Sequence, residues 1–143
     1  MIFLYLTLFI TCFGQYAQAY DPFNSEVREE LQLQEKKSRL QNLRLIREAK
    51  TYLISGNTLR AKKALFQVEE VNDQHKQIKL RFLALIRFIE GDYEKGLGLL
   101  QNDIFKYDNA RTAICDLKTL LMIITGNDDG LGKEIIYCQS VRS

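Results

Sequence analysis

A glycine followed by asparagine or aspartate recurs at a fixed interval along this chain. The three steps are Gly56-Asn57, Gly91-Asp92 and Gly126-Asn127, and both intervals are 35 residues (91 − 56 and 126 − 91). Glycine often ends a helix because it enters the left-handed region without a Cβ clash. Asparagine or aspartate can then cap the next helix with its side-chain oxygen. Each step therefore predicts a corner between two antiparallel helices, and the equal spacing predicts three tandem hairpins in an all-α chain.

The residues around the steps favour closely packed helices. The apolar residues before the second step follow the helical period at Leu80, Leu83, Ala84 and Phe88. Small residues stand seven positions before and five positions after the first two glycines, namely Ala49 and Ala61, then Ala84 and Gly96. The third step has Thr119 and Leu131 at these places, so we expect its two helices to cross more loosely or in a shifted position.

The repeated unit resembles the tetratricopeptide repeat over residues 42–143. The resemblance is carried by the interval of 35 residues, by Gly91-Asp92-Tyr93, and by the small residues at matched places. The usual first-helix Trp and Gly and the closing Pro of that family are missing. The resemblance implies an α-solenoid of three repeats, at residues 42–76, 77–111 and 112–143. An unrelated helical bundle with similar corners is the alternative.

Residues 1–19 differ in character from the rest of the chain. Residues 1–13 are uncharged and mostly apolar, and after Gly14-Gln15-Tyr16 comes Ala17-Gln18-Ala19, a small-x-small pattern. This order is typical of a secretory signal peptide cut after Ala19, although the usual basic residue near the start is missing. We therefore predict an exported protein, periplasmic or secreted, with no stable transmembrane span after cleavage. A retained membrane anchor and lipidation at Cys12 are the alternatives.

Residues 20–41 form a charged segment ahead of the repeats. No helix breaker stands between Glu26 and Lys50, so the first helix is predicted to reach back to about residue 25. Its apolar positions are sparse, and the spacing of Leu33, Leu40 and Leu43 could support only a short coiled coil. We expect a solvated extended helix that caps the first repeat.

Two cysteines, Cys115 and Cys138, remain after the predicted cleavage. An even pair in an exported protein is a candidate disulfide, and the ends of an antiparallel hairpin would bring the two residues together. Two small buried core residues are the alternative. His and Cys residues are too few to predict a metal site.

The remaining candidates for chemistry are weak. His75, the only histidine, is expected in a surface loop between repeats, and Asn127-Asp128-Asp129 lacks the ligand spacing of a calcium loop and is better explained as a helix cap. No pattern predicts a nucleophile with a base or a phosphate-binding loop, so we predict neither an enzyme nor a cofactor. A formal charge of +2 gives no reason to expect nucleic acid as a partner.

The tetratricopeptide resemblance implies that the first helix of each repeat lines a concave binding face. The residues carried onto that face are Arg47, Lys50, Arg81, Phe82, Leu85, Phe88 and Leu120. An apolar floor with basic residues at one end would suit a peptide or helix that carries an acidic group. The predicted function is a non-enzymatic interaction module, a scaffold or adaptor. The alternative is a structural subunit that forms homo-oligomers through its N-terminal helix or an uncapped C-terminal face.

Overall fold

A computed structural model describes residues 25–143, with side chains from residue 28 onward, and this part of the chain is all-α. The predictions of an export signal, of cleavage after Ala19 and of lipidation at Cys12 lie outside the described residues. None of the helices in the described part is both long enough and apolar enough to span a bilayer.

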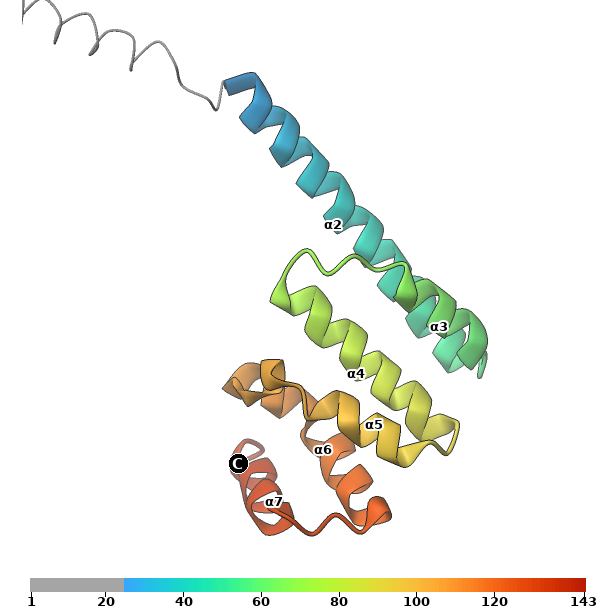
Figure 1. The fold of residues 1–143 in the computed structure, drawn as a ribbon, viewed down its shortest axis with the longest axis vertical. Coiled ribbons are helices and arrows are strands. Elements are labelled where there is room, and N and C mark those ends of the chain that lie inside the picture. Colours follow the sequence, from blue (N-terminus) through green and yellow to red (C-terminus); the bar gives the residue numbers. More distant parts are fainter. Residues whose placement is uncertain (1–24) are drawn as a thin grey trace, which may run out of the picture. The chain divides into compact units, whose positions relative to one another are not determined.

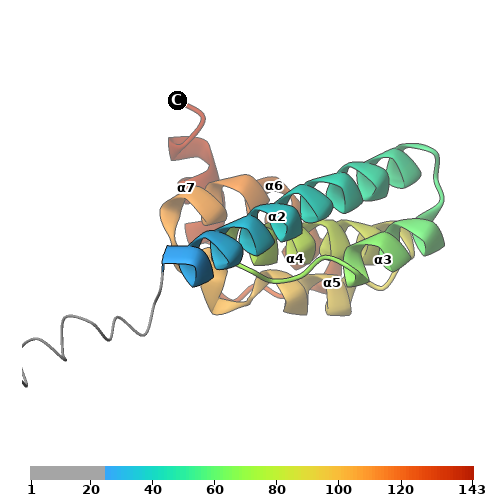
Figure 2. The same ribbon diagram turned by 90° about the horizontal axis from the view of Figure 1, so that it is seen from above.

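The helices follow one another with short connections. In chain order they are α2 (Ser25–Ile54), α3 (Thr58–Phe66), α4 (Asp73–Ile89), α5 (Tyr93–Leu100), the 3₁₀-helix η1 (Asp103–Lys106), α6 (Asp108–Thr125) and α7 (Leu131–Ser140). Residues 38–143 form one compact unit, and residues 25–37 are the helical first part of α2. Within the unit, α4 packs against α3 and α5, and α6 packs against α5 and α7 (Figure 1 and Figure 2).

The three glycine steps have the same backbone structure. Gly56, Gly91 and Gly126 lie in the left-handed region with φ of 76°, 80° and 67°. At each step the N–H after the glycine donates to the carbonyl five residues back, as from Asn57 to Tyr52 at 2.8 Å. The glycine N–H donates to the carbonyl three residues back, as from Gly56 to Leu53 at 3.0 Å. These two bonds form a Schellman motif, so α2, α4 and α6 end in the same way.

The residues after the glycines differ more than the sequence predicts. Asn57 caps α3, because its Oδ1 accepts from the N–H of Arg60 at 3.0 Å. Asp92 stands at the start of α5 but makes no capping bond. Asn127 is not a cap, because α7 begins only at Leu131, after Gly130 adds a second left-handed residue with φ of 76°. Asp92 therefore occupies the predicted N-cap position without the expected side-chain bond, whereas the expected capping role of the 127–129 segment is wrong.

The core consists of two clusters that bridge neighbouring hairpins. The first contains Ala49, Ala61, Ala64, Leu65 and Ile86, from α2, α3 and α4. The second is centred on α4, α5, η1 and α6, with Ala84, Leu97, Leu100, Ile104, Phe105, Ala110, Ile114, Leu121 and Met122. The small residues predicted at the first two crossings are buried, whereas Thr119 and Leu131 at the third are only half-buried.

His75 corrects another expectation. It does not lie in a surface loop, because α4 begins at Asp73 and includes His75 in its first turn. Its side chain is buried, with 6 % of the residue exposed. Its Nδ1 lies 3.2 Å from Nδ2 of Asn42 on α2. The predicted repeat boundaries also differ from the helix starts. The helices α4 and α6 begin at Asp73 and Asp108, four residues before the boundaries predicted at residues 77 and 112.

Candidate interaction surface

Three exposed isoleucines occupy the same position in the three hairpins. Ile54, Ile89 and Ile124 each stand two residues before a corner glycine and are 79 %, 51 % and 43 % exposed. We call them the isoleucine row. A single exposed apolar residue is ordinary on a protein surface, whereas the same one at three equivalent positions is a candidate contact surface. This row was not among the predicted site residues, although the interval of 35 residues that marks the glycines also marks the isoleucines.

A second row lies one helical turn before the isoleucines. It consists of Lys50, Leu85 and Leu120, of which Lys50 and Leu120 are exposed and Leu85 is half-buried. Residues four apart on a helix lie on the same face, so on each of α2, α4 and α6 the two row residues share one face of that helix. We call these six residues the two-row face. Three of them, Lys50, Leu85 and Leu120, belong to the set predicted from the sequence.

Basic side chains accompany the two-row face at its α2 and α4 side. Arg47 and Lys50 are exposed, and no ion pair joins either of them to a carboxylate among residues 28–143. Arg81 on α4 is half-buried, with its guanidinium carbon 5.8 Å from the centre of the Phe82 ring. On α6 the equivalent acidic residue, Asp116, forms an ion pair with Arg142. The face therefore keeps unneutralised positive charge mainly on α2.

Phe82 and Phe88 were expected on the binding face, but the structure places them in packing contacts. Phe82 is half-buried against the first core cluster, where α4 meets the preceding hairpin. Phe88 packs against the second cluster, with its ring centre 5.7 Å from that of Tyr93. The two rings therefore help to hold neighbouring helices together.

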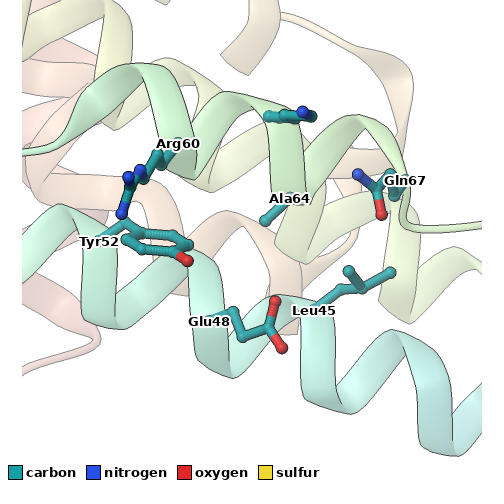
Figure 3. A pocket seen from close by; sticks show the side chains of 7 residues that line it. Leu45, Glu48, Tyr52, Arg60, Ala64 and Gln67 are labelled. Atoms are coloured by element: carbon teal, nitrogen blue, oxygen red, sulfur yellow. The ribbon is translucent and has the colours of Figure 1, made fainter.

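A small pocket lies between α2 and α3, away from the two-row face (Figure 3). Its volume is about 240 Å³, and Figure 3 shows Leu45, Glu48 and Tyr52 of α2 opposite Arg60 and Ala64 of α3 and Gln67, which follows α3. The guanidinium carbon of Arg60 lies 5.8 Å from the centre of the Tyr52 ring. Small-molecule sites usually have about 300–1,000 Å³. The pocket is therefore large enough for one side chain of a partner rather than for a cofactor.

A buried charged group lies between α6 and α7. Glu134 of α7 is buried, and its Oε2 accepts from Arg111 and from Lys118, each at 3.2 Å. Cys115 and Cys138 are within disulfide distance in the same region, with Cα atoms 5.7 Å apart, as the sequence predicted. The sequence analysis missed Glu134, because an isolated glutamate near a chain's last helix gives no sign of burial. Its only signal is its spacing of four from Cys138.

Comparison with known proteins adds no information. No family model matches the chain, and neither a curated protein nor a solved structure shows detectable similarity to it.

Proposed function

We propose that this chain is a non-enzymatic interaction module of tetratricopeptide-like repeats that binds an acidic amphipathic segment of another protein. The observation that carries the proposal is the isoleucine row, Ile54, Ile89 and Ile124, exposed at equivalent positions of three tandem hairpins. A solenoid of such hairpins aligns equivalent positions along one face, which suits an extended or helical ligand.

The two-row face can supply useful binding energy. Burying one exposed isoleucine side chain contributes about 1.5–3 kcal/mol, and about 1.4 kcal/mol corresponds to a tenfold change in Kd. Leu85 and Leu120 in the adjacent row extend the apolar area on α4 and α6. A ligand helix with apolar side chains at intervals of three and four would match this face.

Charge defines the ligand further. Arg47 and Lys50 are exposed beside the α2 end of the face and have no carboxylate partner among residues 28–143. An acidic group on the ligand would pair with them, which favours a defined orientation and a faster encounter more than it adds affinity. We therefore propose a ligand whose acidic end lies over α2 and whose apolar side chains lie over α4 and α6.

We also propose that the module works outside the cytoplasm. The proposal is supported by the apolar segment before Ala19 and by the Cys115–Cys138 pair, since disulfides persist in oxidising compartments.

Peptide selection from a random display library against the immobilised chain tests the function. We expect the selected peptides to combine apolar residues at helical spacing with acidic residues. The variant Ile89→Ser should then weaken their binding about tenfold, because one buried apolar side chain is lost. Lys50→Glu should weaken it as well, and the loss should shrink at high salt because the charges are exposed.

Ile136→Ser is the matched control, because Ile136 is an exposed isoleucine on α7 that lies outside both rows. Peptides that bind Ile89→Ser as tightly as the unchanged chain, but lose affinity for Ile136→Ser, would contradict the proposed face. Selected peptides with no excess of acidic residues would contradict the proposed charge of the ligand.

Self-association is the second candidate, supported by exposed leucines on α2. Leu31, Leu33, Leu40 and Leu43 are each more than half exposed along this helix. Apolar side chains in such numbers on a charged helix could pair two copies of the chain. Sedimentation over a wide concentration range separates the two candidates. A constant monomer mass counts against self-association, and a dimer that Leu40→Glu dissociates supports it.

A further inference from the structure

The α6–α7 hairpin brings three groups with metal-binding chemistry together. Cys115 lies on α6, and Glu134 and Cys138 lie one turn apart on α7. All three are buried, and both sulfur atoms and one carboxylate oxygen lie within 4.8 Å of one another. No other group of His, Cys, Asp and Glu residues with this geometry occurs among residues 28–143.

The carboxylate of Glu134 is only partly satisfied. Its side chain is 7 % exposed, and Oε2 binds both Arg111 and Lys118. The other oxygen, Oε1, is buried and has no hydrogen-bond partner. A buried carboxylate oxygen without a partner is costly, so a native structure that keeps one calls for an explanation. Because Glu134 belongs to the three-residue cluster, a cation bound between its carboxylate and the two sulfur atoms would offer one.

We propose that Cys115, Cys138 and Glu134 bind one thiophilic divalent cation, with Zn²⁺ as the best fit, when the cysteine pair is reduced. Two thiolates and one carboxylate are ligands that Zn²⁺ accepts, at about 2.3 Å for sulfur and 2.0–2.2 Å for oxygen. With the cysteine pair bridged, the three ligand atoms lie within 4.8 Å of one another, so after reduction the two sulfur atoms must move apart and the carboxylate must approach them. Three protein ligands leave the fourth tetrahedral position to a water molecule.

The nearby basic side chains do not prevent cation binding. Two thiolates and one carboxylate carry three negative charges, which offset a divalent cation and one of the two basic groups. Arg111 is further shared with Tyr137, whose ring centre lies 3.7 Å from its guanidinium carbon. Both basic groups contact Oε2 rather than Oε1, and so they hold the carboxylate in place as neighbours of metal ligands commonly do.

The change between the two states balances chemically. An added dithiol gives two electrons to the Cys115–Cys138 bond. The reagent is thereby oxidised to its own disulfide, and the two cysteines become thiols. Cation binding then replaces the two thiol protons, which pass to solvent. The disulfide and the metal site are therefore mutually exclusive states of one cluster.

Cobalt binding tests the proposal on the full chain carrying Cys12→Ser, which leaves only the two relevant thiols. The protein is reduced with a dithiol, the dithiol is removed under anaerobic conditions, and the protein is titrated with Co²⁺. We expect one Co²⁺ per chain, with the absorption of thiolate-bound tetrahedral cobalt, and displacement by Zn²⁺. Glu134→Gln should weaken binding at least about tenfold, because it removes one of the three proposed ligands, and loss even of a group that supports a ligand commonly costs that much. Zn²⁺ should raise the Tm of the reduced chain but not of the oxidised chain.

Asp129→Asn is the matched control, since Asp129 is an exposed acid at the nearby corner. Circular dichroism of every variant shows whether its helices remain. The proposal is overturned if the reduced chain takes up no Co²⁺, or if Cys115→Ser with Cys138→Ser binds it equally well. It is overturned too if a folded Glu134→Gln variant keeps the affinity and spectrum of the unchanged chain.

Discussion

The side-chain amide of Asn42 binds the backbone of Glu69 through both of its polar atoms. Nδ2 donates to the Glu69 carbonyl at 2.7 Å, and Oδ1 accepts from the Glu69 N–H at 3.0 Å. This pairing fixes which amide atom is nitrogen, so the second Nδ2 hydrogen points to Nδ1 of His75 at 3.2 Å. The His75 ring therefore accepts at Nδ1 and carries its proton on Nε2. One buried asparagine thus joins α2, the connector after α3 and the start of α4.

Replacing this asparagine should destabilise the first two hairpins. Asn42 is 1 % exposed, so Asn42→Ala leaves the Glu69 N–H and His75 without these partners, whereas the Glu69 carbonyl keeps its hydrogen bond from the Val71 N–H at 2.9 Å. Each unsatisfied buried group costs about 1–3 kcal/mol, and we expect a loss of about 2–3 kcal/mol in the free energy of unfolding. Urea denaturation measures it. Asn109→Ala, at an exposed position on α6, should change stability by less than about 0.5 kcal/mol. Equal effects of the two substitutions would contradict the role of Asn42.

The cysteine pair should contribute measurably to stability in the oxidised chain. A sequence separation of 23 residues corresponds to about 3 kcal/mol of stabilisation, chiefly because the unfolded chain is constrained. Cys115→Ala with Cys138→Ala should therefore lower the free energy of unfolding by about 3 kcal/mol. Urea denaturation with a chelator present excludes any effect of bound metal. A reductant should destabilise the unchanged chain and leave the double variant as it was. An unchanged chain that is indifferent to reductant would show that the two cysteines are not bridged.

The corners could be predicted from the sequence because their cause is local. A Schellman motif needs one residue with positive φ, and only glycine adopts it without strain, so Gly56, Gly91 and Gly126 mark it directly. The continuous helix from residue 25 to the first corner also agrees with local signals, because no breaker stands in that range.

The candidate sites could be predicted only in part, because burial depends on contacts between distant residues. The sequence placed Lys50, Leu85 and Leu120 on one face but could not show that Phe82 belongs to the contact with the preceding hairpin. His75 reads as polar and exposed until Asn42, 33 residues earlier, is known to meet it. Glu134 likewise becomes a buried group only when α6 supplies Arg111 and Lys118.

Asp103 and Lys106 give a prediction about pH. They form an ion pair of 2.7 Å on η1. The hydrogen bond from Lys106, and then its positive charge, lower the pKa of the Asp103 carboxyl. Because the folded pKa lies below the unfolded one, the small stabilisation is present above the unfolded pKa and is lost as pH falls through the folded value. Carbon-detected NMR titration should show Lys106→Gln raising the pKa of Asp103. Lys95→Gln, which removes a cation paired with Asp92 instead, should leave that pKa unchanged.

Two glycines of α5 should respond to alanine in opposite ways. A Cβ at Gly98 meets nothing within 4 Å, so Gly98→Ala should raise the free energy of unfolding by up to about 1 kcal/mol through helix propensity. A Cβ at Gly96 would lie 3.3 Å from the carbonyl oxygen of Ala84 and 3.3 Å from Cβ of Arg87. Both belong to α4, whose backbone cannot move without opening the second core cluster, and overpacking of this kind costs about 1–3 kcal/mol. Gly96→Ala should therefore be less stable than Gly98→Ala by about 1–3 kcal/mol in urea denaturation. Equal stabilisation by both would mean that α4 and α5 separate freely, and that the small residues at the hairpin crossings are not needed for close packing.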